Sequence, residues 1–339
     1  MAETEFERHM FNRLVEELGR ERATSMQSQF IVARDKVFHE IKNIKGVEPQ
    51  LSDHGPQHIS NVFENVISLI SSDQALHGLT ARELYILGLV VLFHDVGNLF
   101  GREDHHHRIG EVYDWARGVD SNTRREKTLV LRAASAHTGV TRSGSKNTLA
   151  EVEQSDHFDG KPISLRTIAA ILRLADELAE GPQRTTEFFR TTIGYEPTSQ
   201  KFHQYAACTH VSADRASGRL RVTYEFQLDD FELPSNISRI KDLSEFLAFV
   251  LHRVSKLDDE RRYTRFYCRL LDAFRQTDVA MNFYTGARPL EFGLNFQLDD
   301  LVVPGQGAST LDARYPGKCS QPQRIAVDAV QAATERAVQ

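Results

Sequence analysis

The sequence predicts a mainly α protein, with an all-helical first part followed by a smaller α+β part. Apolar residues recur at helical spacing through most of the chain up to about residue 180. The segment that runs from Leu84 to Val96 is apolar nearly all round, which is typical of a helix buried in a core. From Leu220 onward, apolar and polar residues alternate, as in strands that bury one face.

The composition is that of an ordinary globular chain. The 339 residues are 40% hydrophobic and 26% charged, which excludes a fibrous or wholly disordered protein. The 41 basic and 47 acidic side chains give a net charge of −6, so no strong nucleic-acid binding is indicated. The composition is compatible with a homo-oligomer.

The cysteines and the apolar runs indicate a cellular location. Cys208, Cys268 and Cys319 lie far apart without a CxxC motif, which excludes a thiolate zinc site and favours a reducing compartment. No apolar run approaches the roughly 20 residues of a membrane helix, and the N-terminus lacks a signal-peptide core. We therefore expect a cytoplasmic protein with no membrane partner.

The helices of the first part follow from apolar spacing and from end signals. Thr80 and Glu83 have the spacing of a capping box, which predicts the start of the most apolar helix. Gly97 stands where the C-cap of that helix is expected. The predicted helices cover residues 4–45, 59–70, 80–96, 105–117, 123–136 and 164–179.

The second part begins after Gly181-Pro182. Alternating residues predict that strand 220–228 pairs with 209–213, and helical spacing returns over 236–275. A further hairpin is expected around Thr285-Gly286, whereas frequent proline and glycine predict a poorly ordered tail with one weak helix. The predicted domains are 1–185, 186–303 and the tail 304–339, with a motif-bearing core at 54–185.

Histidines and aspartates interrupt the apolar helices. The chain has 14 histidines, and eight of them lie between residues 54 and 137. His58, the pair His94-Asp95, and Asp176 occupy helix positions where an apolar residue would be expected. Because an unpaired buried charge is costly, such groups are expected to be paired or metal-bound. Imidazoles mixed with carboxylates suit a divalent metal such as Mn, Fe, Mg, Ni or Zn.

This order of residues resembles the HD superfamily of metal-dependent phosphohydrolases. The resemblance includes HGxxHxxxV from His54 to Val62, the doublet His94-Asp95 before Val-Gly, and RLAD from Arg173 to Asp176. It covers residues 54–185 and implies an all-helical HD-domain core. It also implies a first set of metal ligands: His58, His94, Asp95 and Asp176. His54 would orient one of these ligands, and the alternative is that His54 is itself a ligand.

Two further histidines resemble the longer ligand set of the HD-GYP subgroup. The segment from His106 to Gly110 looks like its HxxxG segment, and His137 falls where that subgroup has another ligand. The resemblance implies about two divalent ions per chain, with Asp95 bridging them and with His106 and His137 on the second ion. The alternative is a single ion, with His106 and His137 binding only substrate phosphate. The GYP signature itself is absent, and Asn98 replaces the lysine that follows the doublet in that subgroup.

The implied function is cleavage of a phosphate ester or anhydride, in a nucleotide-type small molecule, by metal-activated water. Residues 94–111 also resemble deoxynucleoside triphosphate triphosphohydrolases, which makes His105 or His107 a candidate general acid. Arginines would clamp the phosphate, and the candidates are Arg102 (also placed with Asp95 among the catalytic residues), Arg108, Arg173 and Arg184. The alternatives are a deoxynucleoside triphosphate triphosphohydrolase, a cyclic nucleotide or dinucleotide phosphodiesterase, and a non-catalytic nucleotide-binding regulatory module.

Overall fold

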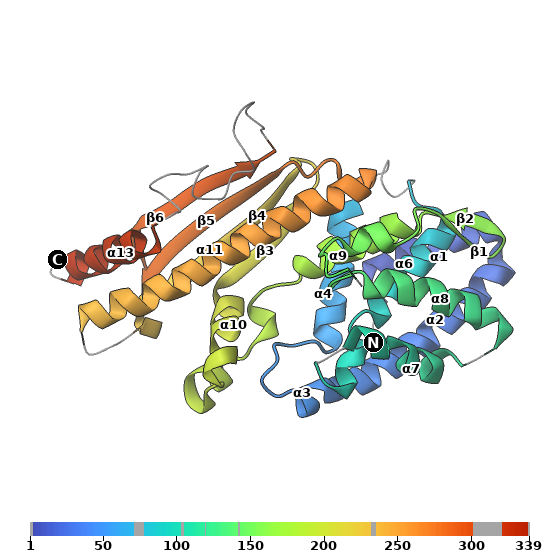
Figure 1. Ribbon diagram of the computed structural model, residues 1–339, viewed down its shortest axis with the longest axis horizontal. Helices are drawn as coiled ribbons and strands as arrows, with labels where there is room; N and C mark the ends of the chain where they lie inside the picture. Colours follow the sequence, from blue (N-terminus) through green and yellow to red (C-terminus); the bar gives the residue numbers. More distant parts are fainter. Residues whose placement is uncertain are drawn as a thin grey trace. The chain divides into compact units, whose positions relative to one another are not determined.

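The computed structural model describes residues 3–70, 78–102, 105–118, 120–141, 143–231, 235–300 and 321–337. The chain divides into two compact units (Figure 1). The first unit combines Met1–Ala179 with Tyr263–Ala273, and the second combines Glu180–Arg262 with Phe274–Gln339. A helical first unit and an α+β second unit confirm the predicted fold class. The return of Tyr263–Ala273 to the first unit is absent from the predicted domains.

The first unit is built from helices that match the apolar runs closely. Among the described residues these are α1 (Glu5–Leu18), α2 (Arg20–Glu40), α3 (Ile44–Val47), α4 (Pro56–Ile70), α6 (Ala81–Phe93), α7 (His105–Arg117), α8 (Ser121–Ser135) and α9 (Leu165–Glu177). Shorter helical turns are η1 (Ile41–Asn43), η2 (Val96–Phe100), η3 (Thr148–Glu151) and η7 (Arg269–Leu271). The single helix predicted over 4–45 is interrupted at Gly19, whose φ of +78° ends α1. A small hairpin of β1 (Asp156–Phe158) and β2 (Lys161–Ile163) was not predicted.

Helix α6 forms the centre of the first unit. The predicted capping box is confirmed, with Thr80 and Glu83 each bonding the other's backbone N–H. Every residue of α6 except Arg82 is buried, and the helix contacts α4 and α9. Contrary to the expectation that no apolar run reaches membrane length, the segment Ala81–Phe100 is long and apolar enough to cross a membrane, but 89% of its most apolar window is buried inside the protein. This segment therefore has the burial of a core helix.

The second unit contains a four-stranded sheet in the order β3-β4-β5-β6. Its elements are η4 (Pro182–Arg184), η5 (Phe189–Ile193), α10 (Pro197–Cys208), β3 (Thr209–Asp214), β4 (Arg219–Gln227), η6 (Leu228–Phe231), α11 (Asn236–Tyr267), β5 (Gln276–Thr285), β6 (Arg288–Asp299) and α13 (Pro322–Ala337). Both predicted antiparallel pairs, β3–β4 and β5–β6, are confirmed. Strands β4 and β5 are parallel, which requires the long crossover that α11 provides.

Helix α11 covers one face of this sheet (Figure 1). The Phe246 ring meets Phe226 of β4 at a centroid distance of 6.1 Å, and Phe226 stacks on Phe283 of β5 at 4.9 Å. The buried residues of β4 alternate from Leu220 to Phe226, as predicted for a strand with one buried face.

The predicted tail contains a packed helix. Residues 301–320 lie outside the described residues, but α13 contacts β6. Ile325, Ala326, Ala329 and Val330 are its buried residues. Their spacing places them on one helical face, which explains why the expected weak helix packs onto the sheet.

Candidate metal centre

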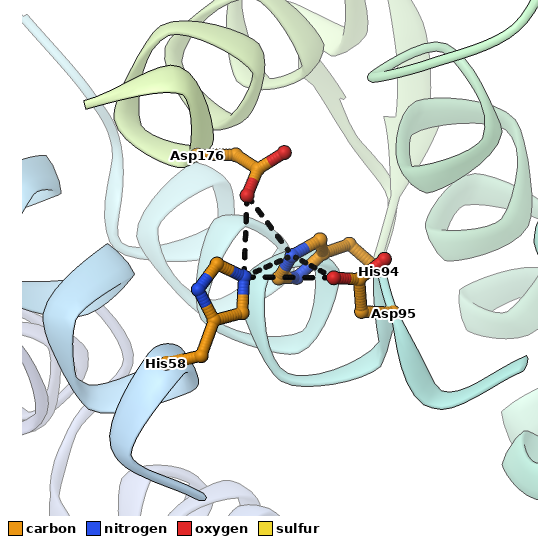
Figure 2. A group of neighbouring side chains, drawn as sticks. All are labelled: His58, His94, Asp95 and Asp176. Atoms are coloured by element: carbon orange, nitrogen blue, oxygen red, sulfur yellow. Dashed lines mark hydrogen bonds and ion pairs between the residues drawn. The ribbon is translucent and has the colours of Figure 1, made fainter. Parts of the chain in front are cut away.

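Three packed helices bring the first group of candidate ligands together. His58 lies in the first turn of α4, His94 caps the C-terminus of α6, and Asp176 lies near the end of α9. Asp95 follows His94 directly and precedes η2. Since α4, α6 and α9 contact one another, their side chains point toward a common centre (Figure 2).

The donor atoms of this first ligand group are closely spaced. The Nε2 of His58 lies 3.2 Å from Oδ1 of Asp176 and 3.5 Å from Oδ2 of Asp95. The Nε2 of His94 lies 3.4 Å from Oδ2 of Asp95 and 3.6 Å from Oδ1 of Asp176. The two Nε2 atoms are 3.3 Å apart. All four residues offer atoms within 4.8 Å of one another, which is the spacing of a metal-binding group.

A second ligand group shares Asp95. Its other oxygen, Oδ1, lies 3.5 Å from Nε2 of His105 and 3.6 Å from Nε2 of His137. The two oxygens of one carboxylate thus face two different sets of imidazoles. The resemblance to the HD-GYP subgroup predicts His106 at this position, but the His106 side chain lies outside the described part of the structure.

Backbone carbonyls orient three of these imidazoles. The Nδ1 atoms of His94, His137 and His105 lie 2.8, 2.5 and 3.1 Å from the carbonyl oxygens of Val91, Ala134 and Arg102, respectively. A carbonyl can only accept, so each Nδ1 donates its proton and each Nε2 faces the centre. This is the arrangement that metal-ligating histidines adopt. A divalent cation fits a buried cluster whose inward-facing atoms are lone-pair donors.

Charges in the cluster shift its protonation. Burial lowers the pKa of His94, but the carboxylates of Asp95 and Asp176 outweigh burial and raise this pKa to about 10. Burial raises the pKa of Asp95, yet the neighbouring histidines outweigh it and hold this pKa well below its usual range. Burial lowers the pKa of His105 to about 4, against the opposing effect of Asp95. Without metal, His94 is therefore charged and His105 is neutral near pH 7.

Metal binding at pH 7 is expected to release roughly one proton, because His94 must lose its charge to become a ligand. In the metal-free protein, the charge on His94 stabilises the fold through Asp95 and Asp176. This stabilisation is fully present below pH 6.5 and is lost as the pH rises toward about 10. Metal affinity should rise over the same interval. Calorimetric titration with Mn²⁺ in buffers of different ionisation enthalpy measures the release. A release of zero protons at pH 7 would contradict this assignment.

Gly97 allows η2 to approach the start of α7. A Cβ atom at this position would lie 1.8 Å from the carbonyl oxygen of His105. The predicted role of Gly97 as a C-cap is wrong, since α6 ends at Phe93 and the turn with positive φ is at Gly101 (+104°). The glycine after the His-Asp doublet instead permits the backbone contact that places His105.

Gly97→Ala is expected to destabilise the first unit by at least about 2 kcal/mol, because backbone must move to accept the new methyl group. The shift of His105 should also weaken Mn²⁺ binding at the second ligand group more than roughly tenfold. Thermal unfolding and Mn²⁺ titration measure the two effects. Gly46→Ala is the matched control, since a Cβ there meets nothing within 4 Å. If Gly97→Ala binds Mn²⁺ as the wild type does, Gly97 has no role in positioning the metal ligands.

Two residues around the doublet hold Asp95 in place. The Nδ1 of His54 lies 2.7 Å from Oδ2 of Asp95, and both side chains are buried. The Asn98 amide donates to the backbone carbonyl of Asp95 at 2.9 Å. His54 thus contacts a ligand of the first group, as predicted for an orienting residue.

Arg102, His107 and Arg108, which follow the His94-Asp95 doublet, lie at the surface. Arg102 is exposed and donates to the side chain of Asn98 at 3.3 Å. Arg108 forms an exposed ion pair with Glu111. His107 is exposed and lies about 200° around α7 from His105. The phosphate and proton-transfer roles of these residues stay predictions.

The other two predicted phosphate-binding arginines have partners within the protein. Arg173 is buried and donates to the carbonyl of Ala136 at 3.1 Å and to Oγ1 of Thr148 at 2.7 Å. Arg184 belongs to the second unit, where it pairs with Glu180 at 3.4 Å. Their roles toward substrate likewise stay predictions.

A comparison with known families finds a match to the HD-CE family over residues 48–256, which is more than half of the chain. The chain belongs to the HD-CE family. The match extends beyond the predicted core and includes α10, β3, β4 and most of α11. No curated protein matches the chain. An HD-type domain that carries buried His/Asp groups indicates a metal-dependent hydrolase of the HD-CE family. The finer likeness to HD-GYP proteins stays a prediction.

Proposed function

We propose that this HD-CE protein is a two-metal phosphohydrolase that cleaves a phosphate ester or anhydride of a nucleotide by metal-activated water. The observation that carries the proposal is the placement of Asp95, whose Oδ2 faces His58 and His94 while its Oδ1 faces His105 and His137. When bound, a pair of divalent ions lowers the pKa of water and stabilises the entering and leaving oxygens of a phosphoryl group.

The residues of the chain contribute orientation and access. His54 donates to Asp95 and holds its carboxylate in the shared position. The Asp176 side chain is 25% exposed, whereas the other members of its group are almost completely buried, so a phosphate would approach beside Asp176. Arg102 is exposed close to His105 and supplies a guanidinium for the phosphate oxygens.

A screen with metals and nucleotides tests the function. Purified protein is supplied in turn with Mn²⁺, Fe²⁺, Mg²⁺, Ni²⁺ or Zn²⁺, together with nucleoside triphosphates, cyclic nucleotides and cyclic dinucleotides. Chromatography of the products distinguishes the alternatives, because release of triphosphate, orthophosphate or a linear nucleotide identifies different reactions. Nucleotide binding without turnover by metal-loaded protein would contradict hydrolysis and favour the regulatory module.

A further inference from the structure

The backbone immediately before His137 is held by distant residues. The carbonyl of Ala136 accepts hydrogen bonds from Oγ1 of Thr148 at 2.6 Å and from Nη1 of Arg173 at 3.1 Å. The N–H of His137 donates to the carbonyl of Ala134 at 3.2 Å. The peptide group between Ala136 and His137 is therefore held at both of its polar atoms. This restricts where the His137 imidazole can lie.

Tyr263 contacts one of these two donors, Arg173, and the residues on either side of the other donor, Thr148. The Arg173 guanidinium lies 4.8 Å from the centre of the Tyr263 ring, within the range of a cation–π contact. The Tyr263 hydroxyl accepts from the N–H of Leu149 at 2.9 Å and donates to Oδ1 of Asn147 at 2.9 Å. Asn147 and Leu149 flank Thr148, so the ring supports one donor and the hydroxyl holds the segment that carries the other.

We infer that Tyr263 is a positioning residue for the second ligand group. By holding Arg173 and Thr148 against the Ala136 carbonyl, it keeps Nε2 of His137 directed at Oδ1 of Asp95. Tyr263 belongs to the segment that returns to the first unit, so these contacts lie within one unit. The inference rests on the proposed two-metal centre.

A purely structural role for Tyr263 makes a different prediction. The last turn of α11 would then only anchor the returning chain, and loss of the hydroxyl would lower stability without changing metal affinity. The positioning role instead predicts a selective effect on one ion, because the first ligand group contains no residue of the 136–149 segment. Metal titration separates the two roles without requiring turnover.

The test compares the second-ion affinity of matched variants by counting free Mn²⁺ with electron paramagnetic resonance. Tyr263→Phe is expected to weaken the binding of the second ion by roughly 3–10-fold, and Thr148→Val by roughly 10–100-fold. The affinity for the first ion should be unchanged in both variants. Thr148→Ser keeps the hydroxyl and should bind like the wild type. Tyr284→Phe is the control, since that hydroxyl contacts Glu225 in the second unit.

The outcomes distinguish this inference from the proposed function. Unchanged second-ion affinity in Tyr263→Phe and Thr148→Val would overturn the positioning role, as would equal weakening of both ions. A wild-type protein that binds only one ion would overturn the inference together with the two-metal centre. If the wild type binds two ions without hydrolysing any nucleotide, the proposed function fails, whereas selective weakening in the variants still supports the role of Tyr263.

Discussion

Asp95→Asn is expected to abolish binding of both metal ions and to lower hydrolysis by at least about 1,000-fold. Asp95 is the residue shared by the two ligand groups, with one oxygen directed at each. The amide keeps the size of the side chain but removes the charge from both groups. Metal analysis of the purified protein and product chromatography measure the two losses.

The variant should remain folded, and its stability should depend on pH. In the metal-free protein, Asp95 pairs with charged His94, and removing one partner of a buried pair costs about 3–5 kcal/mol. His94 can avoid this penalty by losing its proton, so the cost should be smaller at about pH 8 than at about pH 6. Asp114→Asn, at an ion pair with Lys127 near the surface, is the control. Rapid turnover by folded, metal-loaded Asp95→Asn protein would contradict the proposed metal centre.

The first ligand group was accessible to sequence reasoning because its signals are local. His58 and His94 are buried polar residues at the ends of apolar helices, and Asp176, whose side chain is 25% exposed, interrupts the apolar run of α9. The start of α6 was likewise predicted from Thr80 and Glu83, which lie three positions apart in the chain. Patterns of this kind need no knowledge of which elements pack together.

The second ligand group depends on contacts between separate elements. The position of His105 follows from the approach of its carbonyl to Gly97, a contact between η2 and the start of α7. The apolar pattern of α7 does not report this contact, and three successive histidines offer three directions about 100° apart. The resemblance to HxxxG selected His106, one residue further along.

Long-range pairing was also outside the reach of the sequence. Alternation identified β4 and β5 as strands but carries no information about their parallel pairing, which depends on α11 as the crossover. The contacts of Tyr263 with Asn147 and Leu149 join residues more than 110 positions apart. Helix α10 is absent from the predicted helices, and in the structure it packs against β4 and the turns η4 and η5.

His105→Ala is expected to reduce the bound metal from about two ions to one and to lower hydrolysis by at least roughly 100-fold. The Nε2 of His105 faces Oδ1 of Asp95, and its lowered pKa keeps it neutral and ready to bind a cation near pH 7. Its removal leaves His137 and one carboxylate oxygen, too few protein ligands for a stable second ion. His137→Ala should give the same stoichiometry.

His106→Ala is the matched comparison, because it removes the same side chain from the next position of the same helix. Residues adjacent on a helix point about 100° apart, and the described donor that faces Oδ1 of Asp95 from this helix is Nε2 of His105. We therefore expect His106→Ala to keep both ions and to retain hydrolysis within a few-fold of the wild type. Elemental analysis of both variants under saturating Mn²⁺ decides the assignment. The opposite result, with one ion bound to His106→Ala and two bound to His105→Ala, would assign the ligand role to His106, as the spacing to Gly110 predicts. His105 would then be the candidate general acid.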